Sequence, residues 1–183
     1  MGLLIATYII PPQVTMIPKY VLFNDFNILG KIWSIIVPAT FGQGLNSAIF
    51  VLIFYQFYKM IPSVLDEAAE IDGASNFYKY FKIAVPLSIP SFITTFLFSF
   101  VWYWNETYIS SLFLGESFKT LQMRLANFVS EYNSVIGGGN SMYANEAIRM
   151  AATILIILPM LLVYFVLQRW FIEGIDRAGI TGE

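Results

Sequence analysis

The chain has 183 residues, of which 57% are hydrophobic, 17% are aromatic and only 12% are charged, and its formal net charge is -2. This composition is too apolar for an ordinary soluble domain and predicts a membrane protein, while the absence of a basic face argues against binding to nucleic acid. The chain contains no cysteine and no histidine, which excludes disulfides, thiol nucleophiles and the commonest zinc ligands. We therefore expect no enzyme chemistry, no metal site and no cofactor in this chain.

Residues 1–22 are predicted to form a first membrane span. No charge precedes Lys19, and at about 1.5 Å per residue this stretch nearly crosses a hydrocarbon core of about 30 Å. Pro11, Pro12 and Pro18 are expected to break the helix. The double proline predicts either a packed kink or a translocation path in which water satisfies the freed carbonyl groups.

Residues 32–58 carry no charge and are predicted to form a second span, after a short interfacial turn or helix that follows Lys19. Small residues crowd the first half of this span, including Gly42 and Gly44. Small side chains let backbones approach closely, so this half is expected to pack against another helix. Asn46 is expected to hydrogen-bond across helices, with substrate contact as the alternative.

A polar segment, residues 59–84, separates this span from the next and is predicted to hold two short helices. Ser63 is expected to cap the first helix, with Asp66 completing a capping box, and Gly73 is expected to end it. This helix should expose Ala68 and Ala69 as a flat patch beside several carboxylates. Such a surface suits docking to another protein, although a solvated loop would have the same composition.

The second short helix of this segment is predicted to begin after Ser75 or Asn76, either of which can serve as its N-cap. Pro86 is expected to stop it near Ala84, because a proline disfavours helical backbone in the residue that precedes it.

Residues 85–113 are predicted to form a third span with an aromatic end. Trp104, Asn105 and Glu106 stand near the far end of this span. A carboxylate at membrane depth predicts a functional site, and the alternative is that Glu106 reaches headgroup water. An indole, an amide and a carboxylate together also form a surface suited to a hydroxyl-rich ligand.

The remainder is predicted to be a polar outer region followed by a last span. Residues 120–130 should form a short amphipathic helix, and Gly137 to Gly139 a turn. Residues 147–168 are expected to span the membrane with a kink at Pro159, and residues 169–183 to form a tail on the same side as residues 59–84. Basic residues are nearly balanced between the two sides, so charge alone does not orient the chain.

The polar segment carries a spaced motif. Glu67-Ala68-Ala69 is followed by three residues, Gly73, nine residues and then Ile83-Ala84-Val85-Pro86. This resembles the "EAA" loop of ATP-binding-cassette importer permeases, with Val85 in place of the usual leucine. The resemblance implies that the loop is cytoplasmic and that its first helix docks on a partner ATPase. The coupling residues that it implies are Glu67, Ala68, Ala69, Asp72, Gly73, Ile83 and Pro86.

The resemblance extends over essentially the whole chain and is nearest to the second permease of maltose-type carbohydrate importers. Trp104-Asn105-Glu106 looks like an element of sugar permeases, which makes these three residues a candidate substrate path. Family members have about six spans, so the chain looks truncated at its N-terminus. The fold implied is all-α and polytopic, with about four transmembrane helices and a cytoplasmic two-helix coupling loop.

The function implied is that of a permease subunit that couples ATPase closure to alternating access for a sugar or oligosaccharide. The partners implied are a cytoplasmic ATPase dimer that carries out ATP hydrolysis, a second permease, an extracytoplasmic solute-binding protein and the bilayer. Its location would be the inner membrane of a bacterium or archaeon. The alternatives are a secondary transporter, which needs more ionisable groups within the membrane, and a non-transporting scaffold. An amino acid or another small solute is the alternative cargo.

Overall fold

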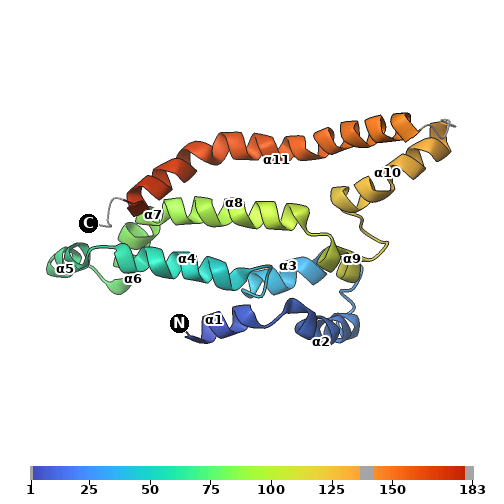
Figure 1. Cartoon of the computed structure of the whole chain (residues 1–183). Helices are drawn as coiled ribbons and strands as arrows, with labels where there is room; N and C mark the ends of the chain where they lie inside the picture. Colours follow the sequence, from blue (N-terminus) through green and yellow to red (C-terminus); the bar gives the residue numbers. More distant parts are fainter. Residues whose placement is uncertain (1, 137–141, 180–183) are drawn as a thin grey trace. The chain divides into compact units, whose positions relative to one another are not determined.

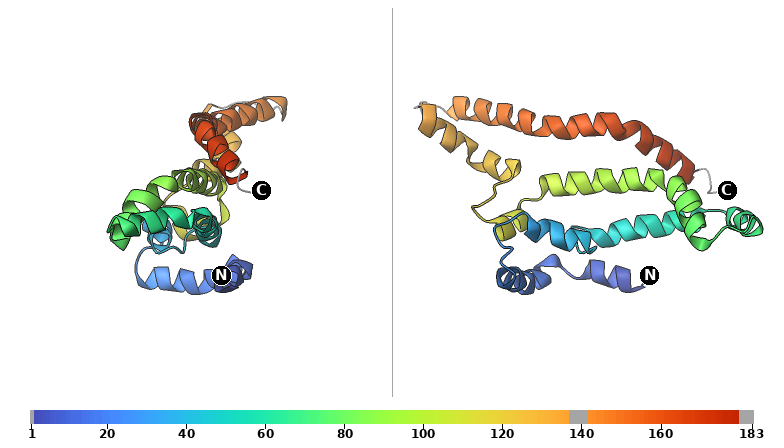
Figure 2. Two further views of the ribbon diagram at one scale, coloured as in Figure 1. Left: turned by 90° about the vertical axis from the view of Figure 1, so that its left-hand side faces the viewer. Right: turned by 180° about the vertical axis from the view of Figure 1, so that it is seen from behind.

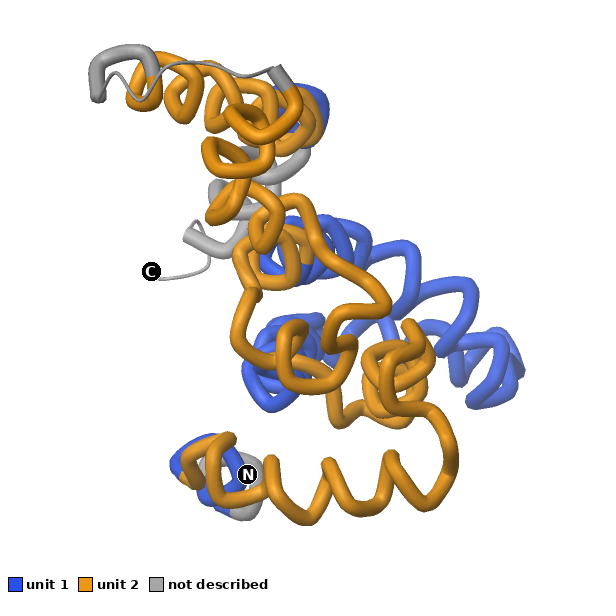
Figure 3. Tube along the Cα trace, turned by 90° about the vertical axis from the view of Figure 1, so that its right-hand side faces the viewer, with its two compact units in different colours: residues 1–9, 46–99, 165–183 blue, residues 10–45, 100–164 orange. Residues whose placement is uncertain are grey.

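The computed structural model describes residues 2–136 and 142–179, and within these ranges the regular structure is helical (Figure 1). The chain divides into two compact units (Figure 3). Unit 1 comprises residues 1–9, 46–99 and 165–183, and unit 2 comprises residues 10–45 and 100–164. The predicted glycine turn, Gly137 to Gly139, lies outside the described residues, as do residues 180–183.

Unit 1 is built around α4 (Ser47–Met60) and the first part of α8 (Ile89–Asn105). The rings of Phe54 and Phe92 meet edge to face with centroids 4.7 Å apart, and the hydroxyl groups of Tyr58 and the fully buried Ser88 lie 3.4 Å apart. Helix α1 (Gly2–Ile9) also contacts α4. These contacts join the helices on either side of residues 59–84, so the polar segment extends from a packed base.

The polar segment folds into α5 (Ser63–Ile71), α6 (Asn76–Lys79), a π-helical turn (Tyr80–Ala84) and α7 (Val85–Leu87). Helix α5 is bent by 66° from α4. Helices α5 and α6 lie together beyond the C-terminal end of α4 (Figure 1 and Figure 2). The two-helix arrangement predicted for this segment is therefore present.

Unit 2 contains α2 (Pro12–Asp25), α3 (Trp33–Thr40), α9 (Tyr108–Leu114), α10 (Leu121–Ile136) and the first part of α11 (Met142–Gly179). Its core joins α2 to α9, since the rings of Phe23 and Phe113 lie 5.0 Å apart and both side chains are buried. The amide N–H of Gly30 donates to the carbonyl of Phe113 at 2.8 Å. The predicted helix at residues 120–130 is confirmed as part of α10, where the Thr120 hydroxyl accepts from the amide of Met123.

Gly44 is one of the small residues predicted to permit close packing, and the structure shows what it packs against. A Cβ atom at this position would lie 2.6 Å from the Tyr103 hydroxyl and 3.1 Å from the Cβ atom of Ala39. The Tyr103 hydroxyl also accepts a hydrogen bond from the amide of Leu45 at 2.9 Å. Close approach is therefore confirmed, and glycine is needed at this position because any side chain would collide with Tyr103.

Three of the four predicted spans are interrupted by breaks between helices. Helix α1 ends at Ile9 and α2 begins at Pro12, whereas Pro18 lies inside α2, so the expected break at Pro18 is wrong. One lost hydrogen bond is tolerated there because the helix continues to be bonded on both sides. Residues 41–46 separate α3 from α4, with φ of +71° at Gly42 and +55° at Asn46. Helix α8 ends before α9 begins at Tyr108.

Helix α11 contains the fourth predicted span and continues through Pro159 to Gly179, so most of the predicted tail is helical. By length and composition, Asn145–Arg169 can cross a membrane. Two bent pairs raise the number of candidate spans in the described residues to three: α4 with α5, and Asn76–Leu87 with α8. The all-α, membrane-spanning fold is therefore confirmed, while the bounds of the four spans stay predictions.

Candidate coupling site

Helix α5 ends as predicted at Gly73, which has φ of +73°. The amide of Gly73 donates to the carbonyl of Glu70 at 3.0 Å, and the amide of Ala74 donates to the carbonyl of Ala69 at 2.9 Å. This pair of bonds is the Schellman arrangement, which satisfies carbonyl groups at the end of a helix and requires a left-handed residue. Asp72 is the C-cap, and its amide donates to the carbonyl of Ala68.

The start of α5 differs from the prediction. Pro62 occupies the N-cap position, Ser63 is the first helical residue, and neither makes a side-chain capping bond. The predicted capping box of Ser63 and Asp66 is therefore wrong. Two factors account for the difference: extended backbone at Pro62, with ψ of 131°, starts the helix one residue earlier, and the Asp66 carboxylate is engaged by a lysine from the next helix.

One face of α5 is exposed along its whole length. Val64, Glu67, Ala68 and Ile71 recur at the i, i+3, i+4, i+7 spacing that places residues on one side of a helix, and all four are exposed. We call these four residues the docking face. Val64 is 68% exposed and Ile71 is 87% exposed, so two large apolar side chains flank the carboxylate of Glu67 and the small side chain of Ala68.

Ala69 does not belong to this face. Its side chain is buried, with 8% exposure, and its carbonyl accepts the bond from Ala74. The predicted exposed patch of Ala68 and Ala69 is therefore right for Ala68 and wrong for Ala69. The reason is geometric: consecutive residues of an α-helix point about 100° apart, so two neighbouring alanines do not share one face.

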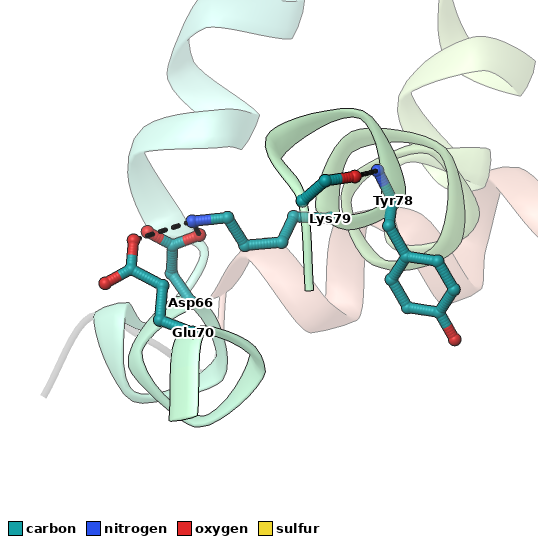
Figure 4. Close-up of polar contacts among 5 residues, drawn as sticks. Asp66, Glu70, Tyr78 and Lys79 are labelled. Carbon is teal, nitrogen blue, oxygen red and sulfur yellow. Dashed lines mark hydrogen bonds and ion pairs between the residues drawn. The ribbon is translucent and has the colours of Figure 1, made fainter. Parts of the chain in front are cut away.

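Lys79 connects the opposite side of α5 to α6 (Figure 4). Its ammonium nitrogen lies 2.9 Å from a carboxylate oxygen of Asp66 and 2.8 Å from one of Glu70. Hydrogen bonds to Glu70 and then to Asp66 raise the pKa of Lys79 above its ordinary value. The Lys79 side chain is 11% exposed, whereas the two carboxylates are 62% and 64% exposed. We call this three-residue contact the brace.

Ser75 caps α6 as predicted, since its hydroxyl accepts a hydrogen bond from the amide of Tyr78. The predicted stop near Ala84 is wrong, because the helical backbone continues to Leu87. Pro86 lies in α7, one residue before the helical backbone ends. The break falls at Ser88, and the helical segments on its two sides are bent by 61° from each other.

A groove of about 320 Å³ runs between α5 and the helical segment that follows it. Leu65 and Asp66 line it from α5, and Lys79, Tyr80 and Ile83 line it from the other side. Ile83, one of the residues of the spaced motif, therefore lies beside α5. Pro86 is exposed and does not line this groove.

The candidate substrate path in unit 2 is already engaged in local hydrogen bonds. The side-chain amide of Asn105 donates to the carbonyl of Val101 at 2.8 Å. One carboxylate oxygen of Glu106 accepts a hydrogen bond from the amide of Ile109, at the start of α9. The side-chain oxygen of Asn105 and the second carboxylate oxygen of Glu106 take no part in these two bonds, so both can still accept a hydrogen bond from a ligand.

Trp104 differs from these two neighbours. Its ring lies 5.5 Å from the ring of Phe100, and its indole nitrogen is buried without a hydrogen-bond partner in the described part of the chain. A buried donor of this kind carries a desolvation cost, so an acceptor that reached it would be bound favourably.

Comparison with known proteins identifies the class of protein. Residues 1–177 match the family described as "Binding-protein-dependent transport system inner membrane component", and the chain belongs to this family of importer permeases. The expected likeness to carbohydrate permeases and the inner-membrane location are thereby confirmed.

Several curated relatives cover nearly the whole chain. It is 32% identical over 173 residues to the polygalacturonan/rhamnogalacturonan transport system permease protein YtcP of Bacillus subtilis, covering 91% of this chain and 59% of that protein. It is 31% identical over 188 residues to the alpha-glucoside transport system permease protein AglG of Rhizobium meliloti, covering 100% of this chain and 46% of that protein. It is 33% identical over 173 residues to AmyC of Thermoanaerobacterium thermosulfurigenes, a probable starch degradation products permease, covering 94% of this chain and 58% of that protein. The chain therefore spans about half the length of these relatives, which are transport permeases and not enzymes.

Two features of the site were not predicted from the sequence. The brace was not predicted because Lys79 lies nine residues from Glu70 and thirteen from Asp66 in the sequence, on a different helix. Two acidic residues one helical turn apart were nevertheless a signal that one cation could contact both of them. Val64 and Ile71 were missed as part of the docking face, although their helical spacing from Glu67 and Ala68 is visible in the sequence.

Proposed function

We propose that this chain is a permease subunit of an ATP-binding-cassette importer, and that α5 is the helix through which a cytoplasmic ATPase moves it. The single observation that carries the proposal is the docking face, exposed on a helix whose other face is tied to α6. Residues 59–84 would then be cytoplasmic, and hydrolysis of ATP would take place on the partner subunits.

The chemistry of the docking face supports a protein partner. Full burial of a side chain such as Val64 or Ile71 stabilises a folded protein or a complex by roughly 1.5–3 kcal/mol. Both side chains are exposed in this chain, so this stabilisation would be gained only on binding to a partner. Glu67 stands between them and can accept charge-assisted hydrogen bonds from an arginine. Ala68 leaves room for close approach. The partner surface would therefore be an apolar groove with a basic residue at its centre.

The docking helix can transmit motion because it is joined at both ends to helices of unit 1. Helix α5 follows α4 through Pro62 and is joined through Gly73 to the segment that leads into α8. An ATPase that binds the inward-facing and outward-facing states with different affinity would shift the balance between them. Gly73 would supply the turn, and Ile83 and Pro86 the connection to the following span.

The cargo that we propose is a sugar or oligosaccharide. The names of YtcP, AglG and AmyC all refer to carbohydrates or their degradation products. Asn105 and Glu106 keep two oxygen acceptors, and the buried indole N–H of Trp104 precedes them in the chain as a donor that lacks an acceptor among the described residues, which suits hydroxyl groups. A second permease and an extracytoplasmic solute-binding protein would complete the importer.

The test is copurification with an ATPase. The chain would be coexpressed with each ATP-binding-cassette ATPase of its own genome in turn, and we expect one of them to copurify. Glu67→Lys should abolish this association and leave membrane insertion intact. The matched control is Glu131→Lys, which makes the same charge change at an exposed acid of α10. If no ATPase copurifies, or if Glu67→Lys retains it as well as the control does, the assignment of α5 is wrong.

A further inference from the structure

Helix α5 buries few side chains that could fix its direction relative to the rest of unit 1. Of its nine residues only Ala69 is buried, and the other eight are exposed. Its connection to α6 consists of residues 72–75, whose hydrogen bonds join the turn to the end of α5 and to the start of α6. A short helix with one buried side chain, held at its ends by this turn and by Ile61 and Pro62, is expected to change its direction readily.

The brace supplies the missing restraint. Asp66 and Glu70 lie one helical turn apart, and one ammonium group contacts both of them. Two points of attachment along α5 restrict both its swing and its rotation, which a single contact would not do. The side chain that makes them is itself 11% exposed, so it lies against the groove and not free in water.

The brace also lies opposite the docking face. At 3.6 residues per turn, Asp66 and Glu70 point on average about 130° away from the stripe of Val64, Glu67, Ala68 and Ile71. A restraint on one side of a helix sets the direction in which its other side points. Contact with a partner and contact with Lys79 can therefore occur together.

We propose that Lys79 is a positioning residue, which bridges Asp66 and Glu70 and thereby holds the docking face in the direction that a partner requires. This inference rests on the proposed function for its purpose, but the geometry that it predicts is a property of the chain alone. The two carboxylates of the brace are 62% and 64% exposed, and ion pairs with such exposed partners contribute little to global stability. Loss of the brace should therefore change the orientation of α5 and not unfold the protein.

The distance between two spin labels tests this directly. The chain has no cysteine, so Val64→Cys and Phe77→Cys provide a unique pair on α5 and α6, and both positions are well exposed. We expect a narrow distance distribution in the parent chain and in Lys79→Arg, which keeps the cation. In Lys79→Gln the ratio of narrow to broad population should fall roughly fivefold. The control Lys82→Gln, at a lysine with no ion pair among the described residues, should resemble the parent.

Further variants separate positioning from simple charge neutralisation. If Lys79→Gln acts only by leaving two carboxylates unneutralised, then adding Asp66→Asn and Glu70→Gln should restore the narrow distribution, and that result would overturn the proposal. A distribution that stays broad in this triple variant supports the proposal. The double variant Asp66→Asn/Glu70→Gln should show the same broadening, and it replaces Lys79→Gln if that variant fails to insert into the membrane. An unchanged distribution in Lys79→Gln also overturns it. Failure of every ATPase to copurify would refute the docking function and leave these distances unaffected.

Discussion

Replacement of Gly73 by alanine tests the turn on which the docking helix depends. Gly73 has φ of +73°, in the left-handed region, and nothing lies within 4 Å of the place where a Cβ atom would stand. The substitution therefore introduces no collision. Its cost is the backbone conformation alone, which is about 1–2 kcal/mol for a residue other than glycine.

Asparagine should cost less than alanine at this position. Asn27 and Asn46 already adopt φ of 54° and 55° in this chain, because a short polar side chain tolerates the left-handed region. Proline should be the most damaging, since its φ is held near -65° and it would remove the amide that donates to the carbonyl of Glu70. The expected order of stability for the turn is glycine, asparagine, alanine and then proline.

Amide hydrogen exchange at Ala74 reports on this turn, because that amide donates to the carbonyl of Ala69 at 2.9 Å. A cost of 1–2 kcal/mol corresponds to roughly 5–30-fold faster exchange in Gly73→Ala when local opening limits exchange. Gly2→Ala, a change in α1 at a glycine without positive φ, should leave this exchange unchanged. Equal exchange in the parent and in Gly73→Ala would refute the reasoning, as would asparagine behaving no better than alanine.

Three further predictions follow from individual contacts. Gly44→Ala should displace the Tyr103 hydroxyl and lower stability by about 2 kcal/mol, and Tyr103→Phe in the same chain should recover part of this in thermal unfolding. Ser75→Ala should remove the N-cap of α6 and accelerate exchange of the Tyr78 amide, at a cost of up to about 1 kcal/mol. Carboxylates raise the pKa of Lys79 above 10.5, so the brace should persist below that pH and be lost as the pH rises through the raised value. The spin-label distances in the parent chain should therefore broaden only in alkaline solution, as the pH rises through the raised pKa of Lys79, and should not respond in Lys79→Gln.

Much of the class of this protein followed from the sequence. An apolar composition with few charges indicates a membrane protein because the bilayer excludes charged groups, and this needs no knowledge of contacts. The ends of the two short helices at Gly73 and Ser75 were also predictable, since a left-handed glycine and a serine cap act through bonds to residues one turn away. The spaced motif led to the family for a similar reason: its identity lies in residue types and intervals alone.

The sequence by itself therefore determined the class of the protein, its helical content and the local turns. Tertiary structure decided which side of α5 faces outward, that Ala69 is buried, and that Lys79 pairs with Asp66 and Glu70. It also decided that the carboxylate of Glu106 bonds to the start of α9. Periodicity shows which residues of a helix share a side, but only its packing against other segments shows which side is covered. Long side chains such as that of Lys79 reach partners whose positions depend on the angle between helices.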